Sequence, residues 1–120
     1  MNIKDYIEPN EYDSEKCSIN DDVWYVETLI KHASDLPVFD LDLSSLDLDV
    51  MPWELKSIFH YIDHFMQTNN CSLEYPVIMS PSGWVMNGWH RISKALIEGR
   101  QTVKAVRFKK LPTPDGKRGE

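Results

Sequence analysis

The order of short apolar and turn-forming segments between residues 75 and 108 constrains the fold more than any other feature of the sequence. Residues 75–86 are two short apolar runs separated by Ser-Pro-Ser-Gly, a pattern typical of two strands joined by a tight turn. Apolar residues at helical spacing in 92–99 predict a short helix that Gly99 ends, and 102–108 predicts a last strand. The 34 residues from 75 to 108 therefore predict a hairpin, a short helix and a further strand, in that order.

The preceding residues add three elements to this pattern. Apolar side chains with a helical period predict a helix from Asn20 or Asp21 to Ala33, and residues 38–43 alternate as a half-buried strand does. A longer helix is expected from Pro52 to Asn70, with one apolar face. The residues that form this face are Leu55, Ile58, Phe59, Ile62, Phe65 and Met66. The predicted fold class is therefore α/β (α+β), with a small mixed sheet of about four strands and three helices.

The length of 120 residues corresponds to one domain. Residues 1–20 are polar and acidic without a sustained period, and we expect a loosely packed arm there. The domain proper is predicted over 21–110, and the proline- and glycine-rich residues 111–120 are expected to form a flexible tail.

Net charge narrows the classes of partner. The chain carries a formal charge of −6, which disfavours autonomous binding to nucleic acid or to an acidic membrane. The charge is unevenly distributed: residues 1–60 hold 4 basic and 14 acidic residues, a balance of −10, and residues 61–120 hold 9 and 5, a balance of +4. An anionic ligand is therefore expected to bind to the second half.

The sequence shows neither a targeting signal nor the cysteine spacing of a metal site. No segment has the apolar length of a membrane span or the apolar centre of a signal peptide, so we expect a cytoplasmic protein that does not contact membranes. Cys17 and Cys71 lack the spacing of a metal site and are expected to be free thiols.

The motif with the clearest chemical meaning is Asn87-Gly88-Trp89-His90-Arg91, between a predicted strand and a predicted helix. A glycine there allows a sharp turn, after which the first N–H groups of the helix have no intrahelical partners. His90, Arg91 and, one turn on, Lys94 add basic groups, so phosphate is the natural ligand. In the alternative interpretation, Asn87 caps the helix and Arg91 pairs with a carboxylate of the first half.

Residues 75–108 resemble the ParB-like and sulfiredoxin-like superfamily, whose pattern is Pro-Val-Ile, a glycine turn, a strand, Asp-Gly-x-His-Arg, a helix, Gly and a strand. The matching segments here are Pro76 to Ile78, Gly83, Val85 to Arg91, Lys94 to Leu96, Gly99 and Val103 to Phe108. The resemblance implies a small fold in which this turn holds the phosphates of a nucleotide. Gly88 would then allow close approach of the backbone, and His90 and Arg91 would contact phosphate oxygens.

Departures from the family pattern restrict the chemistry. Sulfiredoxins have their reactive cysteine where this chain has Trp89, which argues against repair of sulfinic acids. Serine kinases of the superfamily have Asp where this chain has Asn87, and an amide cannot serve as a general base. The remaining catalytic candidates are His90 and a carboxylate supplied by Asp40 or Asp42, or by Asp47 or Asp49 in the loop that follows.

Two further groups of side chains have a structural interpretation. His60 and His64 share one helix face opposite the apolar stripe, and we expect them to be solvated rather than to bind a metal. Trp84 and Trp89 flank the motif and could stack on a base or pack in the core.

Three functions are compatible with the sequence. The first is binding of a nucleotide or other phosphate ligand by Asn87, Gly88, Trp89, His90, Arg91 and Lys94. The second is a non-catalytic adaptor with a degenerate site, binding a protein partner or a second copy of itself. The third is a small kinase, nucleotide hydrolase or nuclease, which would need a carboxylate and normally Mg²⁺ with the nucleotide.

Overall fold

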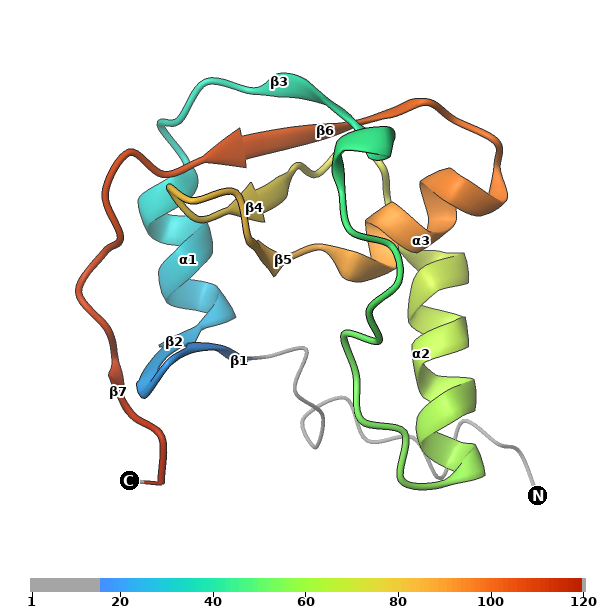
Figure 1. Ribbon diagram of the computed structural model, residues 1–120, viewed down its shortest axis with the longest axis horizontal. Helices are drawn as coiled ribbons and strands as arrows, with labels where there is room; N and C mark the ends of the chain where they lie inside the picture. The colour runs from blue at the N-terminus through green and yellow to red at the C-terminus, as the bar shows by residue number, and fades with distance from the viewer. Residues whose placement is uncertain (1–15, 120) are drawn as a thin grey trace.

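The computed structural model describes residues 16–119 and shows an α+β fold (Figure 1). The expected four-stranded mixed sheet is present, in the order β3-β6-β4-β5. Its strands are β3 (Phe39–Asp42), β4 (Val77–Met79), β5 (Val85–Asn87) and β6 (Thr102–Arg107). β4 pairs with β5 as an antiparallel hairpin and with β6 in parallel, and β3 pairs with β6 antiparallel. The predicted hairpin and the predicted last strand are confirmed.

Three α-helices accompany this sheet in the described part of the chain. They are α1 (Val26–Ala33), α2 (Ile58–Asn70) and α3 (Trp89–Ile97), and a short 3-10 helix, η3 (Leu43–Ser45), follows β3. The prediction of three helices and a small mixed sheet of about four strands is therefore confirmed.

The period-two alternation of the strands divides the core between the two faces of the four-stranded sheet. On one face, Ile78 and Val106 pack with Leu29 of α1 and Trp24. On the other face, Val77, Met79 and Ala105 pack with Ile92 and Ala95 of α3. All three residues of β4 are buried because both faces of this central strand are covered. This arrangement fixes α3, and hence its N-terminus, against the sheet.

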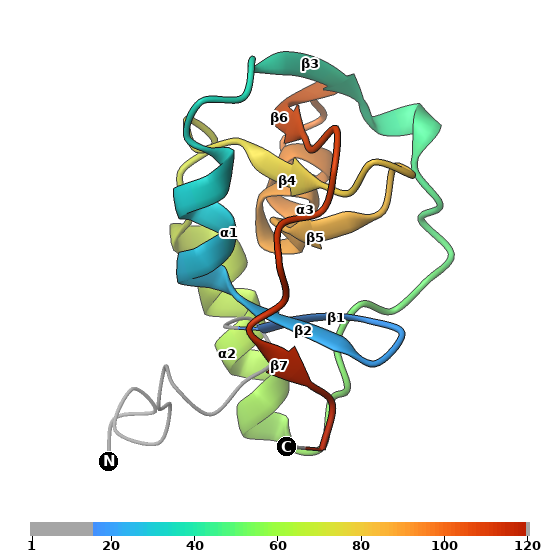
Figure 2. The same ribbon diagram turned by 90° about the vertical axis from the view of Figure 1, so that its left-hand side faces the viewer.

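A second sheet of three strands lies beside the first (Figure 2). Its strands are β1 (Lys16–Ile19), β2 (Asp22–Tyr25) and β7 (Gly116–Lys117), and both pairings with β2 are antiparallel. The helix predicted from residue 20 or 21 therefore begins later, at Val26, because the β-branched and aromatic residues before it form β2. Of the predicted arm, residues 1–15 lie outside the described residues, and residues 16–19 belong to β1.

The prediction of a flexible tail after residue 110 is wrong for the described residues. The buried indole of Trp24 donates a hydrogen bond to the carbonyl of Pro112 at 2.9 Å. The Asp115 carboxylate accepts bonds from the Tyr25 N–H and the Thr28 hydroxyl, and β7 follows directly. These hydrogen bonds to β2 and α1 hold the C-terminal segment in place, although its composition is typical of a linker.

The burial of α2 is the reverse of the expectation. The helix begins after Ser57, whose hydroxyl accepts a bond from the His60 N–H, and not at Pro52. Its buried residues are polar: Asp63, His64 and Thr68. The apolar face, including Ile58 and Phe65, is exposed. The helical period of the sequence correctly divides α2 into an apolar and a polar face, but the polar face is the one that packs against the rest of the protein.

Candidate functional site

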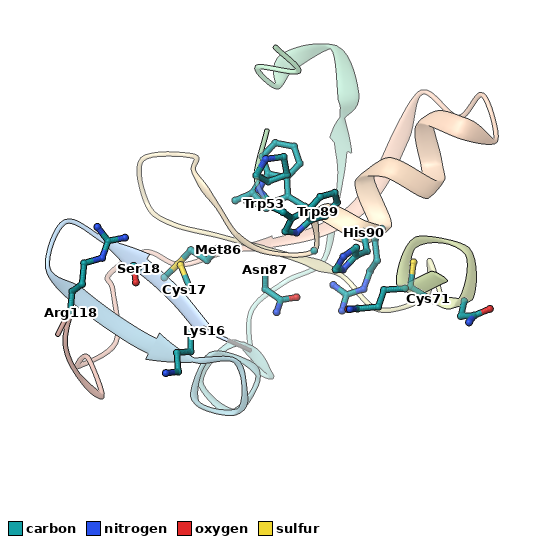
Figure 3. A pocket seen from close by; sticks show the side chains of 16 residues that line it. Lys16, Cys17, Ser18, Trp53, Cys71, Met86, Asn87, Trp89, His90 and Arg118 are labelled. Atoms are coloured by element: carbon teal, nitrogen blue, oxygen red, sulfur yellow. The ribbon is translucent and has the colours of Figure 1, made fainter. Parts of the chain in front are cut away.

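A pocket of about 840 Å³ opens between the three-stranded sheet and the β5–α3 junction. Its lining comes from β1, from Arg118 after β7, from the C-terminal end of α2, from Trp53, and from residues 85–91. Figure 3 shows Lys16 and Arg118 on one side of the pocket, His90 on the other and Asn87 pointing into the space between them. The volume lies in the range of pockets that hold a small molecule.

The β5–α3 junction, which contains the Asn87 to Arg91 motif, forms one wall of the pocket. Gly88 is the N-cap of α3 with φ of +120°, a conformation that glycine adopts readily and other residues avoid. An added Cβ would lie 3.0 Å from Val77 Cγ2, so the turn packs directly against β4. Asn87 is the last residue of β5, and its side chain lines the pocket. The start of α3 therefore faces the pocket with an amide beside it.

Arg91 lines the pocket, and its guanidinium donates a hydrogen bond to the Pro76 carbonyl at 3.0 Å. Within the described residues it has no carboxylate partner, so the alternative in which it pairs with an acidic residue is wrong there. Burial lowers the pKa of Arg91 from its ordinary value, because partial loss of water disfavours the charged form. The remaining N–H groups of the guanidinium can bind an anion.

Lys16 and Arg118 supply positive charge from the opposite wall. Lys16 lies over the ring of Tyr25, 5.7 Å from its centroid, and neither cation forms an ion pair with a carboxylate of residues 16–119. No Asp or Glu of the described residues lines this pocket. Among residues 16–119, the pocket is lined by three cations and no carboxylate, and these residues therefore give the site a positive potential although the chain has a net charge of −6.

His90 is held by two aromatic residues that the sequence analysis did not assign to the site. His64 Nδ1 and His90 Nε2 are 2.8 Å apart, so one nitrogen donates and the other accepts. The ring centroids are 5.1 Å apart with 24° between the planes, so the two rings are close to parallel. The indole of Trp53 stacks on both, with centroids 4.4 Å from His64 and 4.6 Å from His90.

This arrangement keeps His90 neutral. Burial lowers the pKa of His90 to about 4, with smaller contributions from its electrostatic interactions with His64 and Arg91. A neutral imidazole bonded through Nε2 to His64 has a fixed orientation and one remaining ring nitrogen. His90 therefore contributes to the pocket a hydrogen-bonding group that carries no charge at neutral pH.

Not all the predicted residues meet at this site. The pocket brings together Asn87, Gly88, Trp89, His90 and Arg91. Lys94 is not among them: its Nζ donates to the carbonyls of Asn69 and Cys71, and it caps the C-terminal end of α2 instead.

The carboxylate candidates also lie elsewhere. β3, which carries Asp40 and Asp42, and β5 are opposite edges of the four-stranded sheet, three strand spacings or about 14 Å apart. Asp40 is the cross-strand neighbour of Lys104. Asp42 caps η3, and hydrogen bonds from Ser44 lower the pKa of the Asp42 carboxyl. Neither residue lines the pocket.

Of the remaining side chains, Trp84 is exposed on the β4–β5 turn and does not line the pocket, whereas Trp89 does. The expectation that His60 and His64 are solvated is wrong for His64, which is buried against Trp53 and His90. His60 Nδ1 accepts a bond from the Lys56 N–H.

The sequence did not point to several residues of the site, among them Lys16, Trp53 and Arg118, which line the pocket, and His64, which bonds to His90. Lys16 and Arg118 belong to the segments whose composition predicts an arm and a tail, and Trp53 belongs to the predicted first turn of the long helix. Only His64 carried a signal, as one of two histidines four residues apart. The polar face of α2 to which it belongs is buried.

Cys17 and Cys71 are free thiols, as expected, and burial raises the pKa of Cys17 to about 11. Within residues 16–119 there is no group of three or more His, Cys, Asp or Glu side chains arranged to hold a metal ion. No helix in the same range has the length and apolarity required to cross a bilayer. Comparisons of the chain with protein-family models, with curated proteins and with solved structures found no match.

Proposed function

We propose that this protein binds a phosphorylated small molecule, a nucleotide by preference, in the pocket between β1 and the start of α3. The observation that carries the proposal is the charge of the lining: Lys16, Arg91 and Arg118 face the pocket, and no carboxylate of residues 16–119 does. A partly desolvated guanidinium without a counter-ion is costly, and a bound phosphate would compensate its charge.

The shape of the lining favours a ligand with an apolar part as well as an anionic one. Trp53, Trp89 and Val85 add apolar and aromatic surface to the same pocket. Aromatic side chains provide flat surfaces against which a nucleobase can pack. The N-terminus of α3 and the Asn87 amide supply donors for phosphate oxygens.

The observed order of β4, β5, α3 and β6 supports the proposed relationship to the ParB-like and sulfiredoxin-like superfamily. A kinase, hydrolase or nuclease function has no support from the described residues, because Asp40 and Asp42 lie on the far edge strand. The proposed activity is therefore binding, with His90 as a neutral hydrogen-bonding group.

Isothermal titration calorimetry with ATP, ADP, CTP and GTP, with and without Mg²⁺, tests the proposal. Arg118→Ala and Lys16→Ala are the informative variants, because neither side chain supports the fold through an ion pair within residues 16–119. Arg91→Ala is less informative, since Arg91 also holds the Pro76 carbonyl. The matched control is Lys31→Ala, an exposed lysine of α1 that does not line the pocket.

We expect one or more of these nucleotides to bind. Each pocket variant should weaken affinity by about five- to tenfold, about 1 to 1.4 kcal/mol, and rising salt should weaken it further. Lys31→Ala should bind like the unmodified chain. Absence of binding by all four nucleotides, or equal losses in the pocket variants and Lys31→Ala, would refute the proposal.

A further inference from the structure

The negative charge of the chain is concentrated in its first fifteen residues. Residues 1–15 contain one basic residue, Lys4, and five acidic ones, a balance of −4. The five acidic residues are Asp5, Glu8, Glu11, Asp13 and Glu15. Residues 16–119 contain 12 basic and 13 acidic residues, a balance of −1. Most of the net charge of −6 is therefore carried by the segment that precedes the described part of the chain.

This acidic segment ends at the basic pocket. Lys16, which lines the pocket, is the residue that follows Glu15. Figure 3 shows Lys16 on one side of the pocket, with Asn87 pointing into the space beside it. An extended chain spans about 3.5 Å per residue, so the length of chain between Glu11 and Lys16 allows a reach of about 17 Å. A sphere of 840 Å³ is about 12 Å across, so the segment is long enough to reach every part of the pocket.

The carboxylates of the neighbouring three-stranded sheet and its C-terminal segment do not neutralise the pocket, because they are bonded elsewhere. Asp22 pairs with Lys117, and Asp115 accepts hydrogen bonds from the Tyr25 N–H and the Thr28 hydroxyl. No other carboxylate of residues 16–119 lines the pocket either. The charge of its cations is therefore left to a bound ligand or to the acidic segment.

The acidic segment carries both chemical features that the lining favours. A carboxylate, like a phosphate, accepts paired hydrogen bonds from a guanidinium group. Tyr12 lies between Glu11 and Asp13, so an aromatic ring is flanked by two carboxylates. The indoles of Trp53 and Trp89 provide surfaces for such a ring as they do for a nucleobase. The segment therefore resembles the proposed ligand in its chemistry.

We propose that residues 1–15 occupy the basic pocket in the absence of ligand and compete with the phosphorylated ligand for it. This inference rests on the proposed function, since the same pocket and the same cations are involved. The covalent connection through Lys16 gives the segment an effective concentration on the order of 1 mM, so contacts that are weak between separate molecules suffice. The ligand then binds with an affinity reduced by the fraction of chains whose pocket is open.

Neutralisation of the acidic segment in the full chain tests this competition. The first variant combines Asp5→Asn, Glu8→Gln, Glu11→Gln, Asp13→Asn and Glu15→Gln. The matched control removes the same charge from five exposed residues that do not line the pocket: Asp35→Asn, Asp40→Asn, Asp49→Asn, Glu74→Gln and Glu98→Gln. If the segment occupies the pocket in about 70 to 90% of chains, calorimetry at one salt concentration should show that the first variant binds nucleotide about three- to tenfold more tightly than the control.

A second measurement requires no nucleotide. A synthetic peptide of residues 1–15 is added at millimolar concentration to the first variant, and NMR records the amide signals of residues 87–91 and the indole N–H signals of Trp53 and Trp89. We expect these signals to shift. The same peptide with its five acidic residues replaced by Asn or Gln should leave them unchanged, because the pocket cations then lose their partners.

The two measurements separate this inference from the proposed function. Peptide-induced shifts without nucleotide binding support the acidic segment as the occupant and overturn the proposed function. Nucleotide binding of equal affinity in the first variant and the control overturns the inference and leaves the proposed function intact. A peptide that shifts no pocket signal, or that shifts the signals equally after its acidic residues are replaced, also overturns the inference.

Discussion

Replacement of Gly88 by alanine should destabilise the fold through two separable effects. The first is conformational: at φ of +120° an L-residue is strained, which costs about 1 to 2 kcal/mol. The second is steric: the new Cβ would lie 3.0 Å from Val77 Cγ2, 3.1 Å from Val77 Cα and 3.1 Å from Arg91 Nη1. Val77 is in a central strand and cannot move without disturbing its neighbours, so overpacking adds about 1 to 3 kcal/mol.

Gly83→Ala is the matched control for the conformational effect. Gly83 also has a positive φ, +92°, but nothing lies within 4 Å of an added Cβ. The reduced entropy of the unfolded chain is the same for both substitutions and cancels in the comparison. The difference between the two variants therefore measures the close packing of the α3 turn on β4.

Urea unfolding followed by circular dichroism measures both variants. We expect a loss of about 1 kcal/mol for Gly83→Ala and about 3 kcal/mol for Gly88→Ala, with unchanged slopes. If Gly88→Ala is no more than about 0.5 kcal/mol worse than Gly83→Ala, which is within the usual error of such a comparison, the turn does not pack against Val77 as described.

Three further predictions concern the contacts that hold the site. The pKa of His90 is lowered from 6.5 to about 4. The neutral His90 therefore makes its full contribution to the free energy of unfolding above pH 6.5, and this contribution is lost as the pH falls toward 4. The full pKa shift corresponds to about 3 kcal/mol, which the partial exposure of His90 reduces to about 1 to 2 kcal/mol. Unfolding titrations between pH 6.5 and about pH 4 should show this loss of stability in the unmodified chain and not in His90→Gln. Asp115→Ala should cost about 1 to 2 kcal/mol in thermal unfolding, because Tyr25 and Thr28 lose their acceptor; an unchanged melting temperature would mean that the C-terminal segment does not hold α1. Trp53→Ala should raise the pKa of His90 in an NMR titration by admitting water to the histidine pair, and an unchanged titration would contradict the stacking.

Local patterns in the sequence were sufficient for the part of the fold that depends on neighbouring residues. The alternation in residues 38–43, the Ser-Pro-Ser-Gly turn and the apolar spacing before Gly99 each specify an element within a few residues, and the four-stranded sheet and α3 follow from them. The anion-binding turn proposed at 87–91 could be found in the same way, because its glycine and basic residues are adjacent in the chain.

Contacts between segments far apart in the sequence decided which face of α2 is buried, how the C-terminal segment is held and which side chains complete the pocket. The period of α2 defines two faces, but the choice of the buried face depends on what packs against it, and His64 is buried because Trp53 and His90 provide a stacked and hydrogen-bonded environment. Likewise, Trp24 and Pro112 are 88 residues apart, and their hydrogen bond helps to hold residues whose composition is that of a linker. Sequence thus determined the elements and the glycine turn before α3, whereas only the tertiary structure decided which side chains complete the pocket, because burial and pairing are properties of the assembled chain and not of a local window.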